Sequence, residues 1–227
     1  MKGRGCGPYI LIVAVAVILY APLFGNTFLN DDYGRILQVK SLQEETIPTA
    51  FSVLLTKAFS SYYRPLTHIT FYLLYRSVEL LPSYYYLSSV LFHVIAASVF
   101  YVLVRWITDE KDKPGVPWIS VLATFVFLSN PRHVESVSYI HDNENVICGL
   151  FFFAGLALYV KYCRVGHSAF LWFSCLAYLL SLLGKEMGIT LPMVCVAYHF
   201  MFVSGRRLTT FYKDRRIRTA ALSWVVT

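Results

Sequence analysis

Two adjacent carboxylates, Asp31 and Asp32, follow the first long apolar segment of this 227-residue chain. Neighbouring like charges raise the pKa of one of the two groups, which prepares a general base for a hydroxyl or a ligand for a metal ion. The same pair is equally suited to capping a helix at a membrane interface. The Asp-Asp pair alone therefore leaves a catalytic and a structural interpretation open.

Two further polar clusters interrupt the apolar segments. The first runs from Asn130 to Asn145 and holds five possible ligands for a divalent ion: His133, Glu135, His141, Asp142 and Glu144. Their spacing matches no dedicated zinc pattern, and we assign neither a metal ion nor another cofactor. The second cluster is Lys185-Glu186, a charged pair that is costly between two closely spaced membrane spans unless it is paired or functional. The Lys185 ammonium is suited to holding a lipid phosphate.

The composition identifies the medium that surrounds these clusters. Hydrophobic residues make up 57% of the chain and charged residues 15%, whereas an average soluble protein has roughly 45–50% and about 25%. The apolar residues also fall in blocks near the ~20 residues that a helix needs to cross the hydrocarbon layer. We therefore predict an all-α polytopic membrane protein.

About six membrane-spanning helices are expected from the apolar blocks. The third and fourth are short and must extend into flanking residues or lie inside the bundle. The residues after Ala220 indicate the start of a seventh span. The six blocks are Tyr9–Phe24, Leu87–Val104, Trp118–Leu128, Val146–Val160, Ala169–Leu183 and Met187–Val203.

The positions of Lys and Arg predict the orientation. If the N-terminus is cytoplasmic, most basic residues fall in cytoplasmic segments, most densely in Gly205–Arg218, as the positive-inside rule requires. The net charge of +7 is then a topology signal, and we expect no nucleic-acid partner. All three polar clusters lie on the opposite, outer face, where a bundle would bring them together.

The long outer segment 25–86 holds no span of its own. Ile47–Phe59 and Ile69–Leu81 show helix-like apolar spacing, which predicts two helices lying along the membrane surface. The other connections are short, and we expect a single domain over residues 1–227.

Four motifs occur in an order typical of one family: Asn30-Asp31-Asp32, Tyr63-Arg64-Pro65-Leu66-Thr67, His133-Val134-Glu135-Ser136-Val137, and Lys185-Glu186-Met187-Gly188-Ile189-Thr190. Together they resemble the membrane module of the transmembrane and tetratricopeptide-repeat-containing O-mannosyltransferases, within the GT-C glycosyltransferase superfamily. The resemblance covers roughly residues 9–203.

The resemblance implies a GT-C-like fold, a polyprenyl- or dolichyl-phosphate sugar donor, and a Ser or Thr hydroxyl of a protein as acceptor. It implies a catalytic carboxylate at Asp31, with Asp32 as the neighbouring candidate. Arg64 and Lys185 are then candidates for the donor phosphate. His133, Glu135 and Glu186 are candidates for the acceptor side of the pocket.

The chain also departs from the family pattern. Relatives commonly carry a basic and then an acidic residue where this chain has Asn143 and Asn145. The family also continues through further spans and helical repeats, so we expect this chain to hold only part of the machinery. A non-catalytic module that binds a lipid phosphate or a partner subunit is the alternative to an enzyme.

The expected location is either the membrane of the endoplasmic reticulum or a bacterial plasma membrane.

Overall fold

The computed structural model describes residues 6–56, 62–108, 117–205, 207 and 214–226. Every regular element within these ranges is a helix, so the predicted all-α class is confirmed. The last residues of the predicted helix Ile47–Phe59 and the terminal Thr227 lie outside the described residues.

Four helical segments are long and apolar enough to cross a membrane. The first, Gly7–Gly25, joins α1 (Gly7–Tyr20) to the 3₁₀ turn η1 (Ala21–Gly25). The second is α5 (Pro82–Ile107). The third, Ile140–Val165, joins η3 (Ile140–Asp142) to α8 (Asn143–Val165). The fourth, Glu186–Val203, consists of η4 (Glu186–Thr190), α10 (Leu191–Tyr198) and η5 (His199–Val203). These long apolar helices identify the chain as an integral membrane protein.

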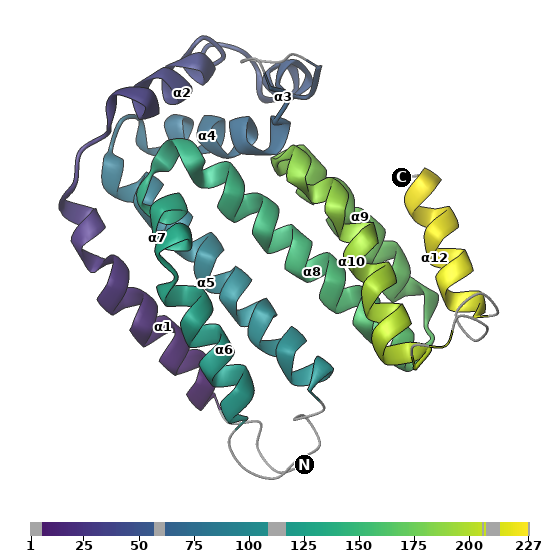
Figure 1. The fold of residues 1–227 in the computed structure, drawn as a ribbon. Helices are drawn as coiled ribbons and strands as arrows, with labels where there is room; N and C mark the ends of the chain where they lie inside the picture. The colour runs from purple at the N-terminus through teal and green to yellow at the C-terminus, as the bar shows by residue number, and fades with distance from the viewer. Residues whose placement is uncertain (1–5, 57–61, 109–116, 206, 208–213, 227) are drawn as a thin grey trace.

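Two of the six expected spans are shorter. These are α6 (Trp118–Ser129) and α9 (Ser168–Gly184). Figure 1 shows α6 alongside α5 and α9 alongside α8, so both short helices pack in the bundle. Neighbouring helices relax the length that a membrane span requires. A total of six spans stays a prediction, as does the GT-C-like fold.

The fourth block is longer than its apolar run. The sequence predicted Val146–Val160, whereas α8 begins at Asn143 and ends at Val165. Its first turn is polar but buried, and cations from other elements compensate the Glu144 carboxylate of that turn. An apolar-run criterion cannot detect such an extension, since the partners are distant in the sequence.

Several short helices gather at one end of the bundle. Figure 1 shows α4 (Pro65–Val78) crossing this end, with α2 (Asn30–Lys40) and α3 (Ile47–Thr56) beside it. The helix α7 (Pro131–Ser138) precedes η3 and contacts both η3 and α8. The sequence predicted helices near α3 and α4, but it did not predict α2 as a helix. Their placement along a membrane surface stays a prediction.

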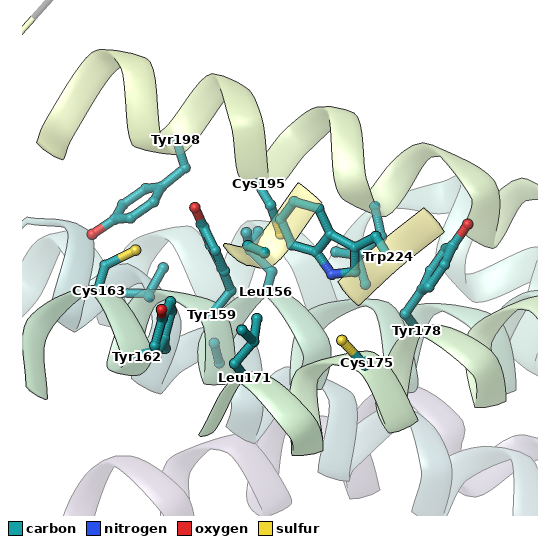
Figure 2. Close-up of a cluster of buried hydrophobic side chains, with 14 of the residues drawn as sticks. Leu156, Tyr159, Tyr162, Cys163, Leu171, Cys175, Tyr178, Cys195, Tyr198 and Trp224 are labelled. Carbon is teal, nitrogen blue, oxygen red and sulfur yellow. The ribbon is translucent and has the colours of Figure 1, made fainter. Parts of the chain in front are cut away.

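A large hydrophobic core lies toward the other end of the bundle. Figure 2 shows Tyr159, Cys195 and Trp224 within it, contributed by α8, α10 and α12 (Arg215–Val226). Cys163 and Cys175 also pack there as small apolar side chains. The segment expected to start a seventh span is thus a helix whose buried face joins the bundle.

Candidate active site

Arg64 occupies the centre of a charged cluster at the α2–α4 end. It is the N-cap of α4, and Pro65 starts the helix with a backbone angle already suited to it. Its guanidinium donates to both carboxylate oxygens of Glu186, at 2.7 and 2.9 Å from Nη2 and 3.1 Å from Nε. Its Nη1 donates to Glu144, and its charged face lies over the Tyr62 ring. Both halves of the guanidinium therefore face a carboxylate.

Glu144 is the shared counter-ion of this cluster. It lies in the first turn of α8, and only 3% of its side chain is exposed. Besides Arg64, it pairs with Arg35 Nη2 at 3.2 Å and with Lys185 Nζ at 3.4 Å. A buried carboxylate is tolerated when its charge is compensated in this way. Sequence reasoning noted Glu144 as a possible metal ligand and missed both its pairing and Arg35.

Lys185 reaches this cluster because the α9–η4 turn lies close against α8. A Cβ on Gly184 would stand 3.2 Å from the Cys148 backbone nitrogen, so a residue without a side chain permits the close approach. The Lys185 ammonium donates to Asn145 Oδ1 at 2.6 Å. Asn145 thus contacts the lysine as a neutral acceptor.

Asp32 is buried and fully engaged with backbone donors. One oxygen accepts from the Leu29 amide at 2.9 Å, and the other accepts from the His141 amide at 2.8 Å. Burial raises the pKa of this carboxyl, although the two amides oppose the shift. These contacts close the first turn of α2 and attach it to η3, which makes Asp32 a structural cap.

Asp31 differs from its neighbour because it is exposed. Its Oδ2 accepts a hydrogen bond of 2.6 Å from the Tyr139 hydroxyl. This bond raises the pKa of Tyr139 to about 12, so the phenol stays protonated and donates at neutral pH. Of the two adjacent carboxylates, Asp31 is the one that an external hydroxyl can approach.

A single short segment connects Asp31 to the charged cluster. The Tyr139 and His141 rings stack at 5.5 Å between centroids, and Arg35 Nε approaches His141 Nδ1 at 3.4 Å. Arg35 follows Asp31 by about one turn of α2, so the two side chains lie on the same face of the helix and both contact the 139–141 segment. The chain Asp31–Tyr139–His141–Arg35 ends at Glu144, and so reaches Arg64 and Lys185.

His133 and Glu135 lie elsewhere on α7. The His133 ring packs against Phe127, with 4.5 Å between ring centroids, and lies 6.1 Å from the ring of His93. Glu135 is exposed, and the structure gives its side chain no contact with Arg64 or Lys185. Among the described residues, no group of three His, Cys, Asp or Glu side chains is arranged to hold a metal ion.

Asn143 is the second position that departs from the family pattern. It is completely buried, and neither polar atom of its amide has a hydrogen-bond partner in the described part of the chain. A small apolar hollow lies apart from the cluster, lined by residues of α1, α5 and α6.

Comparison with known proteins supports the family resemblance. No protein-family model matches the chain. It is 28% identical to the human protein O-mannosyl-transferase TMTC3 over 87% of its length, and 31% identical to human TMTC2 over 90%. The Xenopus laevis tmtc2 protein is 31% identical over 83% of the chain. By sequence, the chain resembles one segment of the TMTC proteins, a family of protein O-mannosyl-transferases.

This match covers only part of each TMTC protein. The chain spans 22% of human TMTC3 and 26% of human TMTC2, or about a quarter of these relatives. The expectation of a family membrane module is confirmed to that extent. The charged cluster is therefore a feature of a TMTC-related segment whose described residues hold four candidate membrane spans.

Proposed function

We propose that this chain transfers mannose from a polyprenyl- or dolichyl-phosphate donor to a Ser or Thr hydroxyl of a protein. The observation that carries the proposal is the exposed Asp31 carboxylate, which is linked through Tyr139 and His141 to a cluster of three cations, in a relative of named protein O-mannosyl-transferases. The reaction would take place on the non-cytoplasmic face, in the endoplasmic reticulum or a bacterial plasma membrane, with the N-terminus in the cytoplasm.

Asp31 is the proposed general base. Its carboxylate would take the proton of the acceptor hydroxyl as the oxygen attacks the anomeric carbon of the sugar. The bond between that carbon and the phosphate oxygen breaks, and the phosphate leaves with the electron pair. Attack opposite the leaving group inverts the anomeric centre. Tyr139 would hold Oδ2 of Asp31, so that Oδ1 faces the acceptor.

Arg64 and Lys185 are the proposed partners of the leaving phosphate. Preorganised cations stabilise charge that develops on a leaving group, and Glu144 already holds both side chains in place. Asp32 supports Asp31 through the fold of α2. Glu135 and Glu186 remain candidates for the acceptor side, and His133, which packs against Phe127, would act there only indirectly.

Sugar transfer by the purified full chain tests this assignment. The assay supplies polyprenyl-phosphate mannose and a Ser/Thr peptide to the protein in lipid vesicles. Asp31→Asn should lower the transfer rate by about a hundredfold or more, because a general base contributes on that order. Glu44→Gln, which neutralises an exposed carboxylate between α2 and α3, is the matched control and should transfer normally. Normal transfer by Asp31→Asn would remove it from the base role.

The non-catalytic alternative has its own support in the structure. Asn143 is buried without a hydrogen-bond partner among the described residues, and Asn145 gives Lys185 no negative charge. If the wild-type chain binds the lipid donor but transfers no sugar when an acceptor is supplied, the alternative holds. The chain would then act as a lipid-phosphate-binding or partner-binding module.

A further inference from the structure

The two carboxylates that hold Arg64 differ sharply in exposure. Only 3% of the Glu144 side chain is exposed, whereas 61% of the Glu186 side chain is exposed. Glu144 is fixed in the first turn of α8 and pairs with three cations. Glu186 pairs with Arg64 from the short 3₁₀ element η4. Glu144 is therefore a permanent counter-ion, and Glu186 is free to exchange with water or another anion.

The geometry of the exposed pair is that of an anion site. Glu186 presents two oxygens to Arg64, with one donor–acceptor distance of 2.7 Å and two of 2.9 and 3.1 Å. A guanidinium binds the oxygens of a phosphate with the same forked arrangement. The Glu186 carboxylate thus lies where a phosphate would bind to Arg64.

The charges of the cluster support an exchange. Arg35, Arg64 and Lys185 carry three positive charges, and Glu144 compensates one of them from within the bundle. If Glu186 turns away, two positive charges are left for an incoming anion. A phosphodiester carries one negative charge and would restore the net charge of +1 that the cluster has with Glu186 in place, whereas a phosphomonoester with two would neutralise the cluster. Lys185 lies next to Glu186 in the chain and would face the same anion.

The surroundings of Glu186 favour a phosphate that is attached to a lipid. Met187 and Ile189, on the same element, are both exposed, and so is Met193 on the following helix. These side chains present an apolar surface directly beside the charged site. An isoprenoid tail would bury them, whereas a free phosphate would leave them in contact with lipid or water.

We propose that Glu186 is a built-in substitute for the donor phosphate: it holds the Arg64 guanidinium in this conformation and is displaced when a polyprenyl phosphate binds. The inference rests on the proposed assignment of Arg64 and Lys185 to the donor. It predicts a gain in affinity when the Glu186 charge is removed, whereas a purely structural ion pair predicts a loss.

Binding of polyprenyl monophosphate to the full chain in lipid nanodiscs tests this exchange. Glu186→Gln should bind it roughly fivefold more tightly than wild type, because a largely exposed ion pair is worth up to about 1 kcal/mol. Glu44→Gln changes the net charge equally at an exposed site and should bind like wild type. Glu186→Asp has a shorter side chain to reach Arg64, and its affinity should lie between those of wild type and Glu186→Gln. Equal or weaker binding by Glu186→Gln would overturn the proposal.

Inorganic phosphate in the same assay separates the two possible ligand sources. Affinity that rises for the lipid phosphate and not for inorganic phosphate supports the lipid assignment, and the reverse contradicts it. The assay involves no sugar transfer, so its outcome is separate from that of the proposed function. A chain that binds as predicted yet never transfers mannose keeps this inference and loses the enzyme assignment. A chain that transfers mannose but gains nothing from Glu186→Gln loses only this inference.

Discussion

The two ends of the helix bundle treat polar groups in opposite ways. At the α10–α12 end, the buried His199 ring contacts the Tyr159 hydroxyl at 3.0 Å and the Asp214 carboxylate at 3.1 Å. Asp214 also accepts from the Arg216 amide at the start of α12. These groups satisfy one another and attach α12 to the bundle. At the α2–α4 end, Asp31 stays exposed although the adjacent Asp32 is buried, and Glu186 stays exposed although its partner Arg64 is buried.

This difference separates polar residues that stabilise the fold from polar residues that are available to a ligand. Burial of a polar group is tolerated when its partners are internal and complete. An exposed carboxylate next to such a cluster does not need internal partners, because water can solvate its charge. The comparison predicts that variants at the α10–α12 end change stability alone, whereas variants at the exposed groups change binding or transfer.

The largest effect is expected at Glu144. Glu144→Gln would leave Arg35, Arg64 and Lys185 without their shared counter-ion, and breaking a buried ion pair costs about 3–5 kcal/mol. Thermal unfolding of the purified chain in nanodiscs should show a large drop in the midpoint. Glu186→Gln removes the same charge from an exposed position and should change stability by less than about 1 kcal/mol. Equal stability of the two variants would contradict the distinction between them.

A smaller loss of stability is expected at the opposite end. His199→Leu removes the contacts to Tyr159 and Asp214, and the loss of this partner from the buried Tyr159 hydroxyl costs about 1–3 kcal/mol. Polyprenyl-phosphate binding by the folded fraction should be unchanged, and this is the measurement to make beside thermal unfolding. A loss of binding at unchanged stability would show that this end also takes part in function.

Tyr139 should affect transfer without affecting stability. Tyr139→Phe removes the 2.6 Å hydrogen bond to Asp31, and losing one such bond to a charged group corresponds to about a tenfold fall in kcat. The KM for the lipid donor should not change, because Arg64 and Lys185 are untouched. Tyr84→Phe removes a hydroxyl from an exposed tyrosine of α5 and is the control. A proportional rise in KM would place Tyr139 at the donor instead.

The smallest effect is a pH dependence of stability at His133. Burial lowers the pKa of this imidazole, so the folded state favours its neutral form. The contribution to stability is therefore complete above the unfolded pKa of about 6.5 and is lost as the pH falls through the lower folded value. Between pH 7.5 and 5.5, wild type should lose more stability than His133→Phe. An identical pH dependence of their unfolding midpoints would contradict this role.

The sequence predicted the class of the fold better than the limits of its helices. Apolar blocks located the four long spans, and basic residues near Gly205–Arg218 led to the hypothesis that the polar clusters share one face. The helix α2 escaped prediction because its two buried apolar residues, Ile36 and Val39, are spaced among polar ones. Its register is set by contacts with the 139–141 segment, which no local pattern reveals.

The candidate site was predicted in its members but not in its pairings. Asp31, Arg64, Lys185 and Glu186 were identified from motifs, and the structure brings the last three together around Glu144. Arg35 and Tyr139 carried no motif, because their partners are more than a hundred residues away in the chain. The different environments of Asp31 and Asp32 likewise depend on His141 and Tyr139, which adjacency in the sequence cannot show.

The location of the donor phosphate tests the account most directly, since both ends of the bundle carry clustered arginines. A polyprenyl phosphate with a photoreactive group beside the phosphate can be cross-linked to the full chain, and the labelled peptides can be mapped by mass spectrometry. Labels in residues 62–66 and 184–190, reduced by competition with unlabelled polyprenyl phosphate, are the predicted result. Labels confined to residues 199–207 and 214–218 would contradict the placement of the donor site at the Asp31 end.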